Sequence, residues 1–220
     1  MTENALAASQ HDSETFALLQ RYISPPPLMV VISGPAGVGK DSVLRRLRER
    51  GLPYHFVVTT TDRQIRGGEV NGVDYHFVTT KEFQCLIDND ALLEYATVYD
   101  QHKGVPKDQV QIAMQSGLDV ILRLDVQGAA IIREKYPQAI SVFLAPPSFD
   151  LLLRRLRGRG GDTDGQLRRR LDTAVAELAR AHEFDYVVVN HESKLEATVD
   201  RVVAILAAER CRTSREAVVF

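Results

Sequence analysis

A glycine-rich loop that joins an apolar run to an amphipathic segment constrains this chain most. The loop consists of Gly34, Pro35, Ala36, Gly37, Val38, Gly39 and Lys40, which fits the pattern GxxxxGK. Residues 28–33 before it predict a buried strand, and residues 41–50 after it predict a helix that ends at Gly51. Glycines let successive backbone N–H groups face an anion, and the helix N-terminus and the lysine add positive charge. The pattern therefore predicts a loop that binds the phosphates of ATP.

The residue after the loop lysine departs from the usual pattern. A Ser or Thr hydroxyl normally stands there and binds Mg²⁺, whereas this chain has Asp41, followed by Ser42. The Asp41 carboxylate could hold the metal directly or through water, or it could simply complement the positive end of the helix. We take Asp41 and Ser42 as candidate ligands of a Mg²⁺ ion that arrives with ATP.

Beyond the loop, strand-like and helix-like segments alternate. The expected strands are residues 119–124, 139–145 and 186–190, and the expected helices are residues 127–135, 148–157, 167–182 and 195–210. Such alternation is typical of a parallel sheet with helices on both faces. The predicted fold class is therefore α/β, with a phosphate-loop core.

Residues 54–105 interrupt this rhythm. They contain a polar, glycine-containing run at 59–72, a strand-like stretch at 74–78 and a short helix at 80–89. Thr79 and Glu82 have the spacing of a capping box at the start of that helix. We expect a small α+β insert beside the parallel sheet.

Charge and composition exclude several classes of function. The formal net charge is −2 and the pI is about 6.3, so no overall basic field favours nucleic acid or an anionic membrane. No apolar run approaches the length of a membrane span, and the N-terminus lacks the pattern of a signal peptide. Cys85 and Cys211 have no metal-ligand spacing. We expect a cytoplasmic protein that binds neither nucleic acid nor membrane, as a monomer or a homodimer.

The insert carries residues suited to a phosphorylated acceptor. Arg63 and Arg66 stand three apart and could grip a phosphate in a fork-like manner, and Tyr75 could add a phenolic donor. An acceptor phosphate is nearly a dianion at neutral pH, so its oxygen needs no general base. The enzyme must instead align two anions and neutralise their charge. The alternative is two solvated surface arginines with Tyr75 in the core.

Over residues 59–77 the chain closely resembles the guanylate kinase family. The resemblance continues through residues 93–96, 124–128, 145–148, 157–160 and 188–190, and it covers residues 28–210. It implies phosphorylation of GMP to GDP by ATP with Mg²⁺. The polar residues 1–27, which end in Pro25, Pro26 and Pro27, predict a flexible extension. The resemblance implies a core (28–53 and 106–210), a GMP-binding insert (54–105) and an Arg-rich lid (about 155–170), which leaves a C-terminal tail (211–220).

The resemblance carries roles onto individual residues. The GMP-binding set is Thr59, Arg63, Arg66, Glu69, Tyr75, Glu94, Lys103 and Asp125, of which Thr59, Glu94 and Asp125 match the positions that read guanine. The ATP-binding set adds Arg155, Arg159 and Asn190 to residues 34–42. The catalytic set is Lys40, Arg63, Arg159 and Arg170.

Some of these roles have alternatives. Asp125 could instead hold Mg²⁺ through water. Asn190 could be a plain turn residue at the end of a strand. The arginine-rich stretch 151–170 could bind nucleic acid, although its leucines have helical spacing.

Four acceptor-side residues differ from the family pattern. Asp62 replaces a threonine, Lys103 a tyrosine, Val105 a hydroxyl that helps to read guanine, and Arg123 an acidic residue. Two other functions therefore stay open. One is a kinase for another nucleoside monophosphate or for ribose bisphosphate, since Asp-Ser after the loop lysine is similar to that group. The other is a non-catalytic module that binds protein ligands, although such modules typically have eroded phosphate loops.

Overall fold

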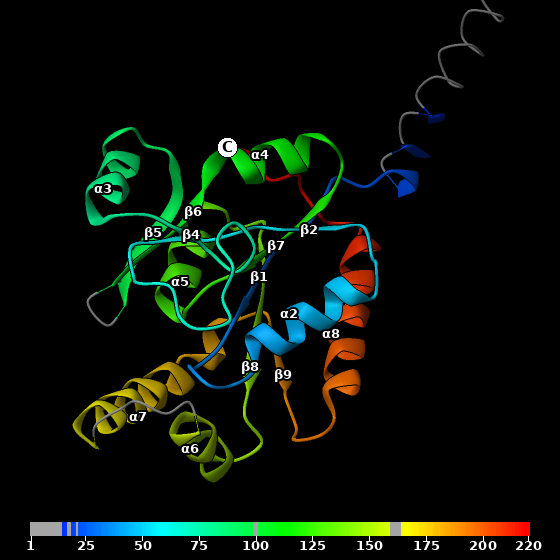
Figure 1. Ribbon diagram of the computed structural model, residues 1–220. Coiled ribbons are helices and arrows are strands. Elements are labelled where there is room, and N and C mark those ends of the chain that lie inside the picture. The colour runs from blue at the N-terminus through cyan, green and yellow to red at the C-terminus, as the bar shows by residue number, and fades with distance from the viewer. Residues whose placement is uncertain (1–14, 17–18, 21, 99–100, 159–163) are drawn as a thin grey trace, which may run out of the picture.

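The computed structural model describes residues 15–16, 19–20, 22–98, 101–158 and 164–220. Its centre is a five-stranded parallel sheet with the strand order β2-β7-β1-β8-β9 (Figure 1). The strands are β1 (Met29–Ser33), β2 (Tyr54–Phe56), β7 (Asp119–Arg123), β8 (Ile140–Ala145) and β9 (Tyr186–Val189). The predicted α/β fold with a parallel sheet is confirmed.

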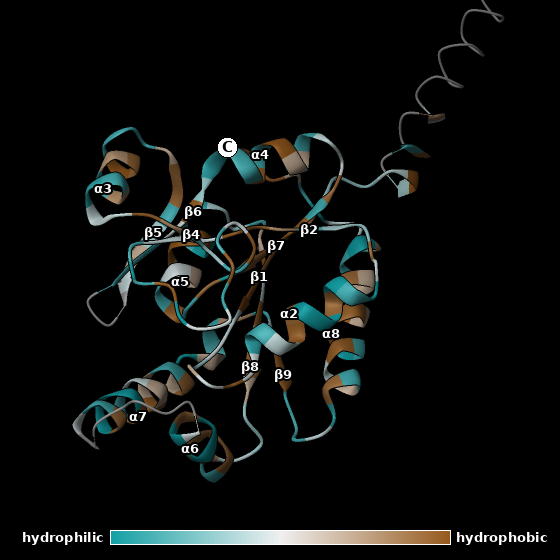
Figure 2. Ribbon diagram, in the orientation of Figure 1, coloured by the Kyte–Doolittle hydropathy of each residue, from teal (hydrophilic) through white to brown (hydrophobic). Residues whose placement is uncertain are grey.

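Helices cover both faces of this sheet. They are α2 (Lys40–Glu49), α4 (Lys107–Gln115), α5 (Val126–Lys135) and α8 (Leu195–Arg210). Alternate residues of β1 point to opposite faces, as the pleat requires. Met29 and Val31 pack in a core with α4 and α5, while Val30 and Ile32 pack in a second core with α2 and α8. The hydrophobic side chains accordingly lie between the layers, and the ribbon of the central strands is largely in the hydrophobic colour in Figure 2.

The insert forms a sheet of its own, with the strand order β4-β3-β6-β5. Its elements are β3 (Thr60–Thr61), β4 (His76–Phe77), α3 (Thr80–Asp88), β5 (Leu92–Val98) and β6 (Gln101–Pro106). Both hydrogen bonds of the expected capping box are present, between Thr79 and Glu82. Residues 54–56, which we expected in the insert, instead pair with β7 at the edge of the main sheet.

Two helices lie beside the phosphate loop where the sequence predicts a lid. They are α6 (Phe149–Arg157) and α7 (Asp164–Ala179), and a short 3-10 turn, η1 (Ala181–Glu183), follows. Leu152 and Leu156 of α6 pack against Ala174 of α7 and Ala36 of the loop. This leucine packing explains the helical spacing in the arginine-rich stretch, whose residues 159–163 lie outside the described residues.

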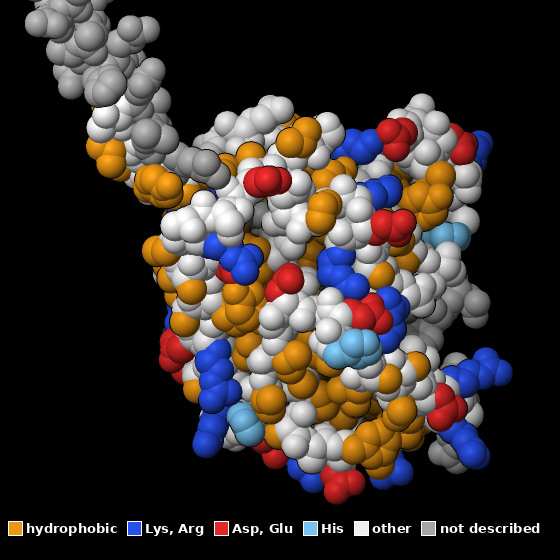
Figure 3. Space-filling model, turned by 180° about the vertical axis from the view of Figure 1, so that it is seen from behind, with side chains coloured by type: hydrophobic (Ala, Val, Ile, Leu, Met, Phe, Trp, Pro, Cys, Tyr) orange, Lys and Arg blue, Asp and Glu red, His pale blue; other side chains and the backbone are white. Residues whose placement is uncertain are grey.

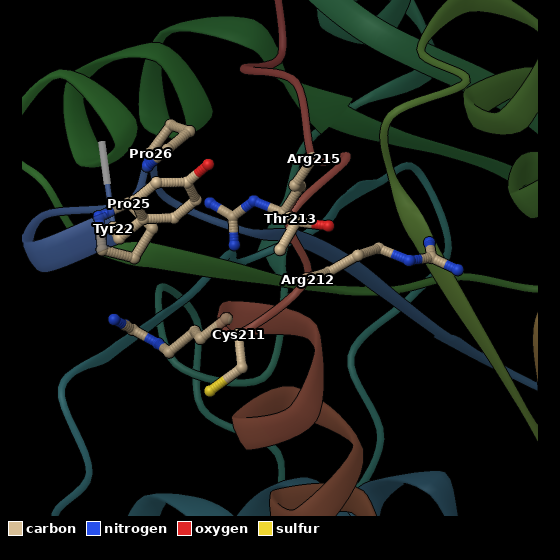
Figure 4. Close-up of a pocket in the computed structure, with 8 residues that line it drawn as sticks. Tyr22, Pro25, Pro26, Cys211, Arg212, Thr213 and Arg215 are labelled. Carbon is tan, nitrogen blue, oxygen red and sulfur yellow. The ribbon is translucent and has the colours of Figure 1, made fainter. Parts of the chain in front are cut away.

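Segments 22–26 and 210–215 line one pocket near the amino end of β7, where Arg210 pairs with Asp119. Figure 4 shows a pocket of about 270 Å³ lined by Tyr22, Pro25, Pro26, Arg210, Cys211, Arg212, Thr213 and Arg215. Val218 of the predicted tail packs on the core, and the ring centroids of Phe220 and Tyr136 are 5.6 Å apart. The flexible extension predicted for 1–27 lies largely outside the described residues.

Two surface properties bear on the predicted partners. On the face shown in Figure 3, basic and acidic side chains are interspersed rather than gathered by sign. None of the helices in the described part of the chain is both long enough and apolar enough to cross a membrane.

Candidate active site

The phosphate loop, residues 34–40, turns at the carboxyl end of β1. In open α/β sheets, ligands bind outside the carboxyl ends of the strands. The pocket near the amino end of β7 therefore lies at the opposite end of the strands from the expected ligand site. Gly34 has a φ of +135°, and a Cβ there would stand 2.3 Å from the Leu144 carbonyl oxygen. Only glycine can adopt this backbone conformation so close to the Leu144 carbonyl group of the neighbouring strand.

Lys40 lies over the loop. Its Nζ donates hydrogen bonds to the Gly34 carbonyl oxygen and, at 3.3 Å, to that of Pro35. Burial lowers the pKa of Lys40 to about 8, and the carboxylates of Glu177 and Asp41 oppose that shift. A partly buried ammonium at the loop is well suited to meet a phosphate.

Two long side chains hold the loop from outside. Asn190 Nδ2 donates to the Val38 carbonyl oxygen at 2.8 Å, and Arg155 Nη1 donates to the same oxygen at 3.0 Å. Asn190 Oδ1 also accepts a hydrogen bond from Thr198 Oγ1 at 3.0 Å. The structure thus places both predicted ATP-binding residues at the loop, with Asn190 engaged in positioning it; its adenine contact stays a prediction.

Arg63 is buried and held on two sides. Its Nη1 and Nη2 form a bidentate pair with Glu69 at 2.7 and 2.5 Å, and its side chain is 5% exposed. Its guanidinium carbon lies 4.6 Å from the ring centroid of Tyr75 and 5.1 Å from that of Phe77. Arg66 is exposed on the surface; its backbone N–H donates to Glu69 Oε2 at 2.9 Å, and its carbonyl oxygen accepts from the Glu69 backbone N–H at 3.1 Å. Glu69 therefore orients Arg63 in this structure.

Glu94 lies on β5 with its side chain buried. It is 2% exposed, and its Oε2 has no hydrogen-bond partner. Burial and then the Asp125 charge raise the pKa of Glu94 to about 8. A Cβ on Gly128 would stand 2.7 Å from Oε2, so the glycine of α5 makes room for the carboxylate. A buried acceptor without a partner is costly and points to a ligand that donates to it.

Asp125 lies beside Glu94 at the start of α5. Its Oδ1 accepts from the backbone N–H groups of Gln127 at 2.9 Å and Gly128 at 3.0 Å, so it caps the helix. The structure brings Asp125 close enough to influence both Glu94 and Lys40. Its two sequence-based alternatives, guanine contact and metal contact, both remain predictions.

The remaining acceptor-side positions line the same region. Thr59 is buried immediately before β3, and Lys103 is half-buried on β6 opposite Thr61. Val105 is fully buried directly across from Glu94. Asp62 directly follows β3 and accepts hydrogen bonds from the backbone and side chain of His102 at 2.7 and 2.6 Å. These bonds connect the end of β3 to β6.

Asp41, at the start of α2, forms an ion pair with Arg123, the last residue of β7. Arg123 Nη1 lies 2.5 Å from Asp41 Oδ1, and Arg123 stacks 4.3 Å from the ring centroid of Tyr75. Ser42 is exposed next to them. Over the described ranges, no three His, Cys, Asp or Glu side chains cluster to hold a metal. One carboxylate and one hydroxyl fit a Mg²⁺ ion held mainly by nucleotide phosphates and water.

The lid side contributes one residue that sequence reasoning missed. Glu177 of α7 interacts with Lys40 and with the backbone of Ala36, and burial raises its pKa. No local motif marks it, because its role depends on α7 packing against the loop. Arg170 lies half-buried on α7, and Arg159 lies outside the described residues.

Comparison with known proteins decides the family. A family model described as guanylate kinase matches residues 27–209. The chain belongs to the guanylate kinase family. The chain is 47% identical to "Guanylate kinase 2, chloroplastic/mitochondrial" of Oryza sativa subsp. japonica over 88% of its length and 68% of that protein. It is 48% identical to the guanylate kinase of Mycobacterium sp. (strain MCS) over 81% of its length and 90% of that protein.

A solved structure agrees. The crystal structure of guanylate kinase from Anaplasma phagocytophilum superposes with a TM-score of 0.71 and 31% identity, covering 86% of this chain and 89% of that one. The resemblance drawn from the motifs is thus confirmed, as is the expectation of a guanylate kinase enzyme.

Proposed function

We propose that this chain transfers the γ-phosphoryl group of ATP to GMP, giving ADP and GDP. The observation that carries the proposal is Glu94, a buried carboxyl group with an unpartnered oxygen. It interacts with Asp125, which in turn interacts with Lys40 of the phosphate loop. Guanine offers N1–H and an exocyclic amine as donors, whereas adenine has an acceptor at N1. A site built to receive such donors rejects bases that lack them.

The roles of the phosphate contacts follow from position. The backbone N–H groups of residues 34–40 and Lys40 bind the donor phosphates. Arg63, held by Glu69 and stacked on Tyr75, binds the GMP phosphate with Tyr75, Arg66 and Lys103. The GMP oxygen is already negatively charged, so the residues align the two phosphates and neutralise them rather than remove a proton.

The lid residues complete the proposal. Arg155, Arg159 and Arg170 would clamp the phosphates, and closure over them would exclude water and limit hydrolysis of ATP. Asp41 and Ser42 would hold Mg²⁺ that arrives with ATP, and the metal would offset negative charge on the phosphates. Asn190 would contact adenine through its second amide N–H, while the first stays on the Val38 carbonyl oxygen.

The setting we propose is purine nucleotide metabolism in the cytoplasm, with small-molecule substrates and neither nucleic acid nor membrane as partner. Both cysteines are free thiols, which fits a reducing compartment. A monomer and a homodimer are both compatible with this role.

A panel of acceptors tests the proposal. The purified chain is assayed with MgATP and, separately, GMP, AMP, CMP, UMP and ribose bisphosphate. We expect GMP to be used with a kcat/KM about 10⁴-fold above that of AMP. Faster turnover of another acceptor, or no turnover of any, would overturn the proposal.

A further inference from the structure

Two departures from the family pattern contact each other. Asp41 replaces the neutral hydroxyl after the loop lysine, and Arg123 replaces an acidic residue at the end of β7. They are separated by 82 residues in sequence, yet Arg123 Nη1 lies 2.5 Å from Asp41 Oδ1. Relative to the family pattern, position 41 has gained a negative charge, and position 123 has exchanged a negative charge for a positive one.

Arg123 also contacts the acceptor side. Its Nη2 donates to the Asp74 carbonyl oxygen at 2.9 Å, and its guanidinium lies 4.3 Å from the Tyr75 ring centroid. Arg63 stacks on the same ring at 4.6 Å. The Arg123 side chain is 16% exposed, so these contacts hold it in one place. It therefore bridges the start of α2 and the loop that carries Tyr75.

An unneutralised carboxylate at position 41 would oppose nucleotide binding. Asp41 directly follows Lys40, so its charge adds repulsion where the donor phosphates bind. A partly buried arginine beside it offsets that charge and is less screened by salt than an exposed pair. A metal ion bound to the phosphates would compete with Arg123 for the same carboxylate.

We propose that Arg123 and Asp41 are a matched pair, in which Arg123 is a positioning residue that neutralises Asp41 and ties the donor loop to the acceptor insert. This inference rests on the proposed function, because it assigns the pair to the ATP and GMP sites. It also explains how the chain retains a phosphate loop with an acid after its lysine. The pair replaces a neutral hydroxyl with a carboxylate that carries its own counter-charge.

Calorimetric titration with ATP, in EDTA and in excess Mg²⁺, tests the pairing through binding rather than turnover. In EDTA, Arg123→Gln should weaken ATP binding by about tenfold or more. In an Asp41→Asn background, the same substitution should weaken it by less than about threefold, because the carboxylate whose charge Arg123 offsets is then absent. Asp41→Asn alone should tighten binding in EDTA and reduce the dependence on Mg²⁺. Equal losses from Arg123→Gln in both backgrounds, or no loss at all, would overturn the pairing.

Matched variants separate the alternatives. Arg46→Gln removes an arginine of α2 that pairs with Glu49 and Glu196 on the exposed surface, and it should leave ATP binding unchanged. Arg123→Lys should retain most of the binding. If Arg123→Gln fails to fold by circular dichroism, Asp41→Asn alone decides, and unchanged or weaker binding in EDTA contradicts the pairing. Failure of the wild-type chain to bind ATP or to use GMP would instead overturn the proposed function.

Discussion

Glu94 and Val105 face each other across the antiparallel strands β5 and β6. The valine is fully buried and offers no hydrogen bond, while Oε2 of the glutamate has no partner. The family pattern has a hydroxyl at position 105, so this chain keeps the carboxyl group that we propose reads guanine but lacks the hydroxyl beside it. The base-reading end of the proposed GMP site is therefore apolar on the β6 side.

Replacing that valine by a hydroxyl should improve GMP binding. Val105→Ser or the near-isosteric Val105→Thr should lower KM for GMP by several-fold, since one hydrogen bond contributes about 1 kcal/mol. Val120→Thr is the control, because Val120 is equally buried in β7. It should lower stability without changing KM. An unchanged KM in the Val105 variants would place that side chain away from the base.

The buried charge of Glu94 should affect stability as a function of pH. Its pKa in the folded chain is about 8, above its ordinary value of 4.5, so the folded state holds a proton that the unfolded state releases between those pH values. The contribution to the free energy of unfolding is thus present below pH 4.5 and is lost as pH rises through 8.

Glu94→Gln should abolish that loss. We expect similar unfolding free energies for variant and wild type near pH 4.5, and a variant more stable by about 2 kcal/mol or more at pH 9. Its kcat/KM for GMP should fall by about 10²-fold or more. Denaturant titrations at several pH values measure the first effect. A stability difference that does not grow with pH would contradict the assigned burial of this charge.

Removing the loop lysine should separate fold from function. Lys40→Ala deletes the ammonium that lies over the Gly34 and Pro35 carbonyl groups, so kcat should fall by about 10² to 10³-fold. Circular dichroism should show an unchanged fold. Normal turnover in this variant would mean that the loop does not bind the reacting phosphates.

The Arg63–Glu69 pair should matter for GMP alone. Glu69→Gln removes one charge from the bidentate pair and should raise KM for GMP about tenfold while leaving KM for ATP unchanged. Glu49→Gln is the control, because Glu49 pairs with Arg46 on the exposed surface at 3.2 Å. Equal effects on both substrates would show that Glu69 serves the fold and not the acceptor site.

Local patterns predicted the core of the fold well. The strand at 28–33, the helix after the loop and the capping box at Thr79 all rest on signals within a few residues, and the structure has each of them. Strand β2 was missed because Tyr54–Phe56 joins the main sheet only through pairing with β7, far along the chain. The sequence also did not predict the antiparallel strands β5 and β6 of the insert, or the helix α4 that follows them.

The candidate site shows the same division. The types and order of residues in the sequence led us to assign Lys40, Arg63 and Glu94 to one site. The sequence did not reveal that Glu69 holds Arg63, that Glu177 reaches Lys40, or that Arg123 pairs with Asp41. These relationships depend on which elements the tertiary fold places side by side, and side chains distant in sequence carry no local period that would indicate them.

The central claim is that donor and acceptor phosphates meet among the same cations. A conjugate of adenosine and guanosine joined through five phosphates tests this most directly in a calorimetric titration. We predict that it binds at least about 10²-fold more tightly than ATP or GMP alone, because one molecule then fills both sites. Lys40→Ala should abolish this gain. Binding no tighter than that of either nucleotide alone would contradict the account.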